Sequence, residues 1–445
     1  MSHRYLPHTP SDIKTMLEKC GVSDIDELCA DVPPELRLSA PYNLGPEMSE
    51  HKVRCFFNEL GGKNRDLTCF AGAGYYDHYT PAVIPQIIER GEFLTAYTPY
   101  QPEISQGTLQ YIFEYQSMMA SLTGMEVSNA SMYDGTTATA EAMLMAVAHA
   151  RKRTKVLISS TVAPAVREVC ATYALYHGVE LVEIESVGGV TSVNALTQAL
   201  EADDVAGVIV ATPNFYGILE DYTGVADLCH KHKALLIMHT IPSDLGMIKT
   251  PGEWGADIAV GDAQSLGMPL CFGGPYMGFI CCTKALIRKM PGRIVGATVD
   301  SKGRRVFVLT LQAREQHIRR DKATSNICSN QGLMSLFAAM YLSVTGVAGL
   351  REICEQGYNG AHYLAGKLVA TGRWEMTYPD APYFNEFCLT AKGIDVDAFM
   401  NLCVSQGILP GVKISDDRML VAVTETRTKE EMDQLVALAE QCQTA

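Results

Sequence analysis

Two short segments of this chain place polar side chains directly after apolar runs. The run Asp257–Val260 is followed by Gln264 and Ser265, and the run Leu235–Met238 is followed by His239. A hydroxyl group cannot form an imine, which is the bond by which an amine side chain holds an aldehyde. A neutral imidazole does not supply the charge of a carboxylate. Ser265 therefore cannot form an imine as a lysine would, and His239 does not supply the negative charge that a carboxylate would.

The order of these elements resembles that of pyridoxal-phosphate (PLP) enzymes. In those enzymes a strand like Asp257–Val260 leads into the lysine that holds the cofactor, and here Ser265 stands at the expected position, next to Gln264. An aspartate that pairs with the pyridinium nitrogen ends the other strand, and His239 stands at or beside that place. An ordinary hydrogen-bonded histidine at a strand end explains His239 equally well.

Two lysines elsewhere in the sequence are candidates for forming an imine. Lys249 lies in an expected surface loop, and Lys284 follows the apolar run Gly278–Cys282. Solvated charge is the simpler interpretation of both side chains. An autonomous PLP enzyme that uses Lys284 stays an alternative.

The turn Ser131–Thr137 precedes a helix that the sequence predicts over Thr136–Ala150. A turn of small residues at a helix N-terminus leaves free N–H groups, which suit a phosphate. Ordinary capping of the helix by Asp134 explains the same residues. The sequence favours capping.

Residues from about Phe70 to Tyr115 are rich in Gly, Tyr, Pro and Gln, a composition that predicts no regular element. Long ordered loops of polar and aromatic residues are disproportionately functional. A structural turn region filled by tyrosines would have the same composition. For the segment Tyr97–Gly107 both interpretations stay open.

The stretch Leu309–Gln331 is dense in charged and polar residues where the expected large domain ends. Its arginines could bind a carboxylate or a phosphate in a bidentate manner. They could also bridge domains or subunits through Glu315 and Asp321. The interleaved charges favour this structural role.

Near-continuous apolar runs alternate with helical patterns after Thr136, which indicates a mostly parallel sheet covered on both faces. The rhythm changes in the last hundred or so residues, where helices and strands predict a small α+β domain. Thr428 and Glu431 form an expected capping box before the final helix. The predicted domains are a helical arm over 1–65, a large α/β domain over 66–335 and a small α+β domain over 336–445.

The composition excludes some classes of protein. A net charge of −14 argues against a nucleic-acid binder or a protein that binds anionic membranes. The fourteen cysteines show no Cys-x-x-Cys motif and no zinc-finger spacing, so we expect neither disulfides nor a metal site. Met1–Pro7 lacks the apolar run of a signal peptide, and we expect no stretch to span a bilayer. These features favour a reducing cytoplasm.

Four motifs closely resemble the glycine decarboxylase P-protein family, specifically its N-terminal half, which many bacteria encode as a separate subunit 1. The resemblance covers essentially the whole chain, and motifs of this length are highly specific. The motifs are 74–79 (GYYDHY), 97–107 (YTPYQPEISQG), 129–135 (NASMYDG) and 314–320 (REQHIRR).

The resemblance implies a PLP-dependent transferase fold of type I and a division of labour between two subunits. In the family, glycine loses its carboxylate as CO2 on the PLP of subunit 2, and an aminomethyl group passes to the lipoyl arm of H-protein. Subunit 1 is then a degenerate, pseudoenzyme-like copy that binds no PLP covalently, in an α2β2 heterotetramer of an oxidoreductase complex.

We expect the polar and aromatic segment Tyr97–Gly107 to lie at the interface with subunit 2, near the catalytic pocket or the lipoyl entry channel. The arginine-rich motif is the second candidate segment for this interface. The candidate residues are Tyr97, Tyr100, Gln101, Glu103, Ser105, Gln106, Arg314, His317 and Arg319.

The sequence therefore leaves three candidate functions. The leading one is a subunit of the glycine cleavage system that does not bind PLP. The second is the autonomous PLP enzyme, such as an aminotransferase or a desulfurase relative. The third is a catalytically silent scaffold without a role in glycine metabolism.

Overall fold

The structure, a computed structural model, describes the whole chain except residues 1–4, 6, 39, 41, 324 and 443–445. Residues 1–65 and 66–445 form two separate compact units. The predicted lack of a signal peptide concerns Met1–Pro7, most of which lies outside the described residues.

The first unit is helical, as the sequence predicts. Helix α1 (Pro10–Cys20) begins with a capping box, in which Thr9 and Asp12 bond each other's backbone N–H groups. Helix α2 (Glu50–Gly61) follows after two short 3-10 turns. No described residue of this unit is buried, so its apolar side chains lack a core of their own.

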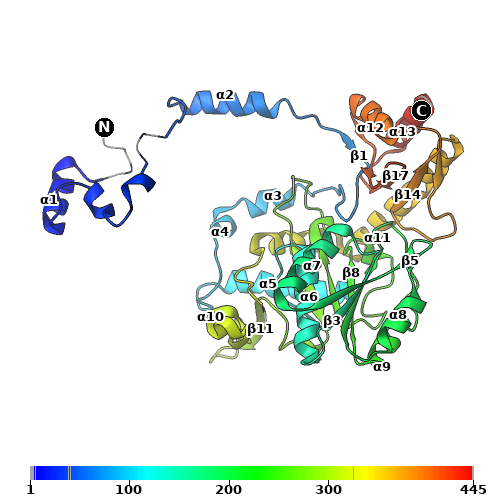
Figure 1. Ribbon diagram of the computed structural model, residues 1–445, viewed down its shortest axis with the longest axis horizontal. Helices are drawn as coiled ribbons and strands as arrows, with labels where there is room; N and C mark the ends of the chain where they lie inside the picture. Colours follow the sequence, from blue (N-terminus) through cyan, green and yellow to red (C-terminus); the bar gives the residue numbers. More distant parts are fainter. Residues whose placement is uncertain (1–4, 6, 39, 41, 324, 443–445) are drawn as a thin grey trace. The chain divides into compact units, whose positions relative to one another are not determined.

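The second unit is built on a seven-stranded sheet with the order β2-β10-β9-β8-β7-β3-β4 (Figure 1). Strands β3, β4, β7, β8 and β9 run parallel, and β10 runs antiparallel to both of its neighbours. This arrangement confirms the predicted mostly parallel α/β sheet. The strands are β2 (Val127–Ser128), β3 (Lys155–Ser159), β4 (Glu180–Ile184), β7 (Val205–Thr212), β8 (Leu235–Thr240), β9 (Ile258–Asp262) and β10 (Gly278–Cys282).

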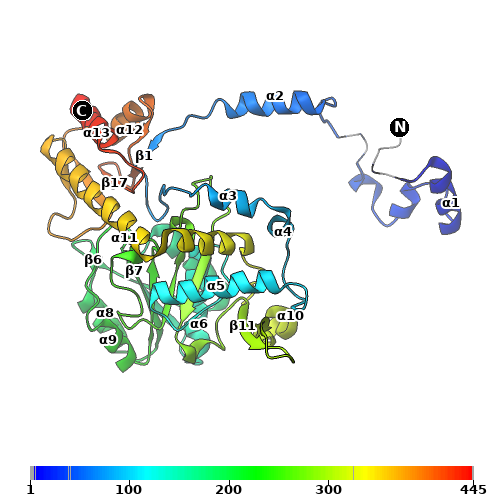
Figure 2. The ribbon, with the colours of Figure 1, turned by 180° about the vertical axis from the view of Figure 1, so that it is seen from behind.

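Helices cover both faces of this sheet, because successive side chains of a strand point to opposite faces. Ile209, Ile237 and Ile258 pack against α6 (Gly135–Ala150) and α7 (Pro164–His177) on the face seen in Figure 1. The other face is covered by α5, α8, α9 and the first half of α11, part of which Figure 2 shows in front. These helices are α5 (Gln106–Thr123), α8 (Val193–Leu200), α9 (Val225–Lys231) and α11 (Gly332–Ala370).

The prediction of no regular element over Phe70–Tyr115 is wrong in part. Helix α5 already begins at Gln106, and it follows α3 (Val83–Ile88) and α4 (Gly91–Leu94). Leu109, Ile112 and Tyr115 are buried at helical spacing on α5. This apolar period prevails over the polar composition of the segment.

Three pairs of strands were not predicted, and in two of these pairs each strand has only two residues, too few for a pattern. One of them, the antiparallel hairpin of β11 and β12, leads into the arginine-rich motif. That motif forms two 3-10 turns around the short helix α10. The elements are β1 (Thr68–Cys69) with β15 (Ile408–Leu409), β5 (Ser186–Val187) with β6 (Val190–Thr191), β11 (Ile294–Val299) with β12 (Arg305–Thr310), and α10 (Gln316–Arg319).

The C-terminal part has a four-stranded antiparallel sheet of order β13-β14-β17-β16 and a core of its own. The final helix begins with the predicted capping box of Thr428 and Glu431. These observations agree with the expected α+β character. The elements are β13 (Trp374–Met376), β14 (Glu386–Ala391), β16 (Val412–Lys413), β17 (Arg418–Ala422), α12 (Val396–Ser405) and α13 (Lys429–Gln441).

Helix α11 joins the two cores and bends at Gly346, whose backbone is not helical. Phe337 packs in a core of the large sheet, and Leu364 packs in the C-terminal core. Among the described residues only α11 is long and apolar enough to cross a membrane. This test uses length and composition only, and α11 contributes buried residues to both cores, so the expectation that no stretch spans a bilayer stays a prediction.

A backbone contact ties the large sheet to the C-terminal sheet. The N–H of Leu219 donates to the carbonyl of Pro382 (2.8 Å), and the N–H of Phe384 donates to the carbonyl of Gly217 (3.1 Å). A Cβ atom on Gly217 would lie 2.0 Å from the carbonyl oxygen of Glu386. Gly217 therefore permits the close approach of the two sheets.

We expect Gly217→Ala to destabilise the fold by about 1–3 kcal/mol more than Gly188→Ala, because only the first creates an overlap. Both glycines have positive φ, 79° and 64°, and a Cβ on Gly188 meets nothing within 4 Å. Backbone strain is thus common to both variants, and Gly188→Ala controls for it. Urea unfolding measures the difference, and equal midpoints would contradict the close contact.

Candidate functional site

The carboxyl ends of β3, β7, β8 and β9 meet at one edge of the sheet, because these strands are parallel. Ligands of open α/β sheets bind at such an edge. His239 is the penultimate residue of β8, Asp262 ends β9, and Gln264 and Ser265 lie in the 3-10 turn that follows. The N-terminus of α6 opens at the same edge through Gly135, whose N–H bonds Asp262.

The side chain of Gln264, just after β9, uses both its amide oxygen and its amide nitrogen in hydrogen bonds. Its carbonyl oxygen accepts from the N–H of Tyr76 (2.8 Å), and its amide donates to the carbonyls of Tyr76 (2.8 Å) and Met268 (2.7 Å). The Oγ of Ser265 accepts from the N–H of Ser243 (3.2 Å). Both side chains are buried. The expected lysine position is thus occupied by groups that hold neighbouring loops.

His239 lies where the sequence predicts it, at the end of β8. Its Nδ1 is 3.0 Å from Oγ1 of Thr139 on α6. Part of the ring remains accessible, yet the surrounding protein atoms desolvate it, and burial lowers its pKa to about 4. At neutral pH the imidazole is therefore uncharged, and it does not replace a carboxylate.

Two carboxyl groups occupy the N-terminus of α6. Oδ1 of Asp134 accepts from the N–H of Thr137 (2.9 Å), which confirms capping as the better interpretation. Oδ2 of Asp262 accepts from the N–H of Gly135 (3.0 Å), and burial raises the pKa of Asp262 to about 7. A phosphate dianion would find the N–H groups of Gly135 and Thr137 already used and would lie beside the carboxyl groups that accept from them.

The residues at this edge therefore do not fit PLP. Ser265, next to Gln264, stands where the lysine is expected, and His239 stands where the carboxylate for the ring nitrogen is expected. The helix end that could bind an anion carries Asp134 and Asp262. Sequence reasoning missed Asp262, although a carboxylate directly after the buried run Ile258–Gly261 was a usable signal.

The structure contradicts the alternative that uses Lys284. Because β10 is antiparallel to β9, its Cys282 end lies opposite Ile258, at the other edge of the sheet from Asp262. Lys284 is exposed there and forms an ion pair with Glu126 (3.3 Å). About 16 Å of strand separates the two edges, so the amine cannot reach the site.

Lys249 is also occupied elsewhere. Its Nζ lies over the ring of Trp254, 3.6 Å from the ring centroid. This cation–π contact explains the side chain without a role in catalysis.

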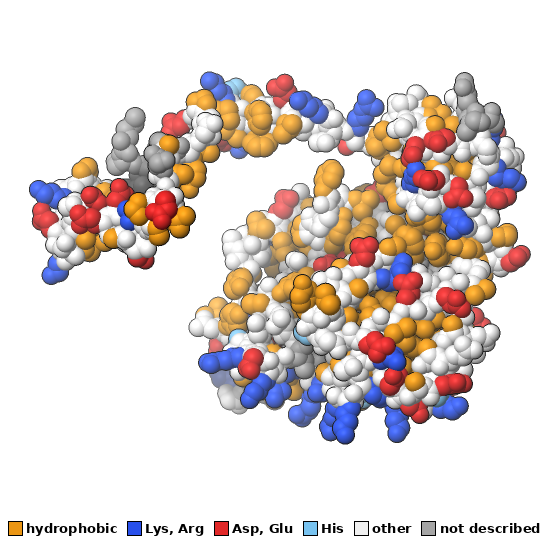
Figure 3. Space-filling model, viewed as in Figure 1, with side chains coloured by type: hydrophobic (Ala, Val, Ile, Leu, Met, Phe, Trp, Pro, Cys, Tyr) orange, Lys and Arg blue, Asp and Glu red, His pale blue; other side chains and the backbone are white. Residues whose placement is uncertain are grey.

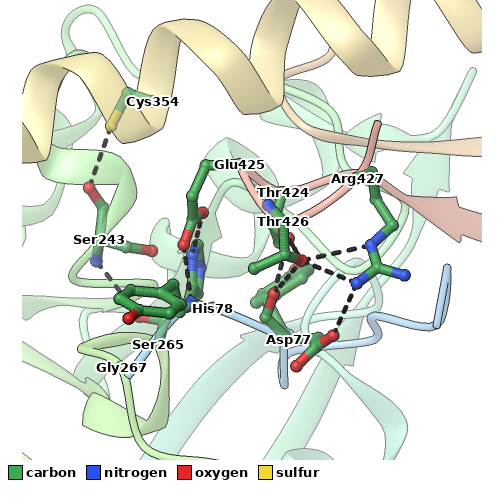
Figure 4. A network of polar contacts seen from close by, with 12 residues as sticks. Asp77, His78, Ser243, Ser265, Gly267, Cys354, Thr424, Glu425, Thr426 and Arg427 are labelled. Carbon is green, nitrogen blue, oxygen red and sulfur yellow. Dashed lines mark hydrogen bonds and ion pairs between the residues drawn. The ribbon is translucent and has the colours of Figure 1, made fainter. Parts of the chain in front are cut away.

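A buried polar network joins the loop 72–80 to the C-terminal domain (Figure 4). His78 contacts Glu425 (2.7 Å), whose other oxygen accepts from the N–H of Tyr79 (2.8 Å). The carboxylate of Asp77 pairs with Arg427 (3.1 Å), and the carbonyl of Asp77 accepts from Thr424 (2.6 Å). This loop therefore lies fixed between the two domains.

Two further buried carboxyl groups line the same junction, and neither was predicted. Glu386 accepts from the hydroxyl of Tyr76 (2.9 Å) and the N–H of Ala73 (2.7 Å), and burial raises its pKa to about 7. Burial also raises the pKa of Asp244 to about 7. Sequence distance hid Glu386, since its partners Tyr76 and Ala73 are brought to it only by the fold.

A cavity of about 500 Å³ lies beside the N-terminus of α6. Tyr75 and Tyr276 stack in its wall, with ring centroids 5.1 Å apart. The remaining wall is polar or belongs to a glycine-rich loop. Its other lining residues are Tyr133, Asp134, Thr136, Phe272, Gly273, Pro275 and Gln331.

Of the predicted interface residues before α5, four lie at the surface and two do not. Tyr97 and Tyr100 are 76% and 55% exposed, and Gln101 and Glu103 are exposed as well. Gln106 instead bonds the backbone of Phe307 on β12 from both ends of its amide. Ser105, at the start of α5, is half-buried and makes no side-chain cap.

The arginine-rich motif likewise contains both an inward-facing residue and exposed residues. Arg314 is half-buried and turns inward to the carbonyl of Met290, and burial lowers its pKa. Its place at an interface stays a prediction. His317 and Arg319 on α10 are exposed. Figure 3 shows basic side chains gathering over the part of the molecule where Figure 1 labels α10.

The two exposed segments belong to one face of the molecule. Gln106 ties the start of α5 to β12, which leads into α10. Tyr100 lies over Arg293, whose guanidinium carbon is 5.6 Å from the ring centroid. Figures 1 and 2 both place α10 next to the β11 hairpin. The structure therefore brings the exposed candidates Tyr97, Tyr100, His317 and Arg319 to the same side.

Asp244 gives the fold a pH dependence of defined sign. Between its usual pKa of 3.8 and its folded value of about 7, the folded state holds a proton that the unfolded state has released. The free energy of unfolding therefore falls as pH rises through this window, by up to roughly 1.4 kcal/mol per pH unit. The contribution is fully present below the window and lost above it.

We expect Asp244→Asn to flatten this slope, because the amide stays neutral and its oxygen keeps the contact with Ser243. Urea midpoints at about pH 5 and about pH 8 measure it. The control is Asp221→Asn, which changes an exposed carboxylate whose pKa is lowered by Thr223. A slope equal to that of the unsubstituted chain would contradict the prediction.

Comparison with known proteins gives consistent results. The family model of the glycine cleavage system P-protein matches residues 3–439. The probable glycine dehydrogenase (decarboxylating) subunit 1 of Anoxybacillus flavithermus is 48% identical over 445 residues, with 98% of each chain covered. The protein of the same name from Moorella thermoacetica is 48% identical, with 97% of this chain and 98% of that protein covered.

Solved structures agree. A crystal structure of glycine decarboxylase (P-protein) of the glycine cleavage system, in inhibitor-bound form, matches with a TM-score of 0.90 at 41% identity and covers 99% of this chain and all (100%) of that chain. Alanine–glyoxylate aminotransferase from Nostoc sp. has a TM-score of 0.62 at 18% identity, with 91% of this chain and 99% of that chain covered, and shows the fold alone.

These likenesses confirm the PLP-dependent transferase fold of type I. They extend over nearly the full length of the chain and of the relatives. The chain belongs to the glycine cleavage system P-protein family.

Proposed function

We propose that this chain is subunit 1 of a two-subunit glycine decarboxylase and that it holds no PLP itself. The observation that carries the proposal is the filled site at the end of β9, where Gln264 bonds Tyr76 and Met268. The relatives named subunit 1 support it, since that name implies a second subunit. A lysine in the second subunit would then hold the cofactor.

The reaction follows from the family. With subunit 2, the complex would decarboxylate glycine and transfer the aminomethyl group to the lipoyl arm of H-protein, as an oxidoreductase of the glycine cleavage system. PLP supplies the electron sink for such a decarboxylation when it is bound. This chain would complete the assembly, and the exposed residues of Tyr97–Gly107 would border the entrance used by the lipoyl arm.

An α2β2 heterotetramer in the cytoplasm is the assembly that we propose. Two subunits of one fold pair naturally through equivalent faces. Cysteines are used here as small buried residues, as Cys281 and Cys403 illustrate, which suits a reducing compartment.

One prediction concerns covalent binding of PLP by this chain alone. The purified chain, mixed with PLP and reduced with borohydride, should carry no stoichiometric pyridoxyl group on a lysine, because Gln264 and Ser265 stand at the cofactor position. Subunit 2 treated in the same way is the positive control. Peptide mapping measures it, and a single fully modified lysine in this chain would overturn the proposal.

The second prediction concerns the exposed loop. Glu103→Ala should lower glycine–bicarbonate exchange by the complex with subunit 2 and H-protein by about tenfold or more, without changing the unfolding midpoint of the chain. Glu201→Ala, at the exposed end of α8, is the matched control. Tyr100→Ala should act in the same direction, and it also removes the contact with Arg293.

Exchange activity also separates the proposed function from a silent scaffold. A scaffold without a role in glycine metabolism would not restore exchange when it is added to subunit 2 and H-protein. Unchanged exchange with Glu103→Ala would instead leave the subunit assignment in place and remove the loop from the entrance.

A further inference from the structure

Glu141 on α6 is a buried carboxyl group without a basic partner among the described residues. Its side chain is 4% exposed, and its neighbours Ala140 and Ala142 are buried apolar residues. It bonds Ser325, and no described basic side chain contributes to its pKa, which burial raises to about 7. A buried carboxylate without a basic partner destabilises a fold. The position of Glu141 therefore requires an explanation other than stability.

A cavity of about 260 Å³ opens beside this carboxyl group. Its wall comes from α6, from α7, which lies next to α6 in Figure 1, and from the segment after the arginine-rich motif. Among the described residues of this wall, Glu141 is the one acid, and no lysine or arginine is present. The aromatic and ionisable residues of the wall are Tyr133, Glu141, Tyr173, Tyr176 and His177.

Three tyrosines share the wall with the carboxyl group. Tyr133 and Tyr173 are half-buried, and Tyr176 is 82% exposed, so it lies at the mouth. Burial raises the pKa of Tyr173, and the charges of Glu141 and Asp134 raise it further, which shows a negative potential at this ring. Ring faces and carboxylates both attract cations. The cavity is therefore suited to a positively charged ligand.

We propose that this cavity binds a small organic ammonium ion, whose N–H groups donate to Glu141 and whose charge lies against the tyrosine rings. The proposal does not rest on the function proposed above. Hydrogen bonds from an ammonium to a carboxylate are charge-assisted, and the cation would hold the carboxylate in its ionised form. The volume lies below the range of about 300–1,000 Å³ that is usual for drug-sized ligands, so the ligand is small.

A metal ion suits the cavity less well. Hard cations such as Ca²⁺ require about six oxygen ligands or more, several of them carboxylates. The described residues contain no group of three or more His, Cys, Asp or Glu side chains that could hold a metal ion.

An amino acid zwitterion also fits poorly. Its carboxylate would lie near Glu141, and the described wall offers no lysine or arginine to pair with it. Like charges at such a distance repel each other. The charges of the cavity therefore select a cation without a carboxylate.

The test is a titration of the full chain followed by saturation-transfer NMR. The probe is n-butylammonium chloride, and sodium chloride keeps the ionic strength constant. The unsubstituted chain should give a saturable signal. 1-Butanol, which lacks the charge, and 4-aminobutanoate, which adds a carboxylate, should each bind about tenfold more weakly or worse.

Substitutions locate the probe in the cavity. Glu141→Gln should raise the dissociation constant of butylammonium by about tenfold or more, because the amide keeps the shape and loses the charge. Glu168→Gln is the matched control, since Glu168 is exposed on α7 and the change of charge is the same. Tyr173→Leu, which removes a ring and keeps an apolar side chain, should raise the constant by about threefold or more. Urea midpoints verify folding, and Tyr173→Leu still tests the site if Glu141→Gln does not fold.

Three results would overturn the proposal. One is the absence of saturable binding to the unsubstituted chain. Another is an affinity that Glu141→Gln and Tyr173→Leu leave unchanged, which would place the probe elsewhere on the surface. The third is loss of the signal on addition of subunit 2, which would assign the cavity to a side chain of that subunit. None of these results changes borohydride labelling or glycine–bicarbonate exchange, so failure of this site leaves the proposed function intact.

Discussion

The pairing of Gln264 with the backbone of Tyr76 is the interaction on which the centre of the molecule depends. It fixes the loop 72–80 at the end of β9, and the same loop carries His78 to Glu425 of the C-terminal domain. Buried backbone groups must be satisfied. A lysine at position 264 has no acceptor oxygen and would leave the N–H of Tyr76 without its partner.

The charged groups at the same edge of the sheet also disfavour PLP. A cofactor phosphate needs free N–H groups at a helix end, whereas Asp134 and Asp262 already accept those of α6. A pyridinium nitrogen needs an anion, whereas His239 is uncharged at neutral pH. Three separate replacements therefore convert a binding site into a stable interior, and each remaining polar group has a use within this chain. The stability of the fold no longer requires a ligand there.

The sequence predicts those parts whose signal is local. The strands of the large sheet are continuous apolar runs, and Ser265 and His239 lie at strand ends as expected. Arg314 could not be placed, because its partner, the carbonyl of Met290, is brought to it only by the fold. Glu386 was missed for the same reason, since its partner Tyr76 is hundreds of residues away. Long-range contacts decide which charged residues face solvent.

The same internal hydrogen bonds that fill the interior of this chain also make its exposed loops rigid. Loops that are held by many internal bonds lose little entropy when a partner binds them. The network around Tyr76 and the bonds of Arg293 and Cys328 supply that rigidity from within. The exposed rings of Tyr97 and Phe272 then offer contact area that this chain does not use itself. Rigid loops that expose these rings are therefore suited to contact a partner in the proposed complex.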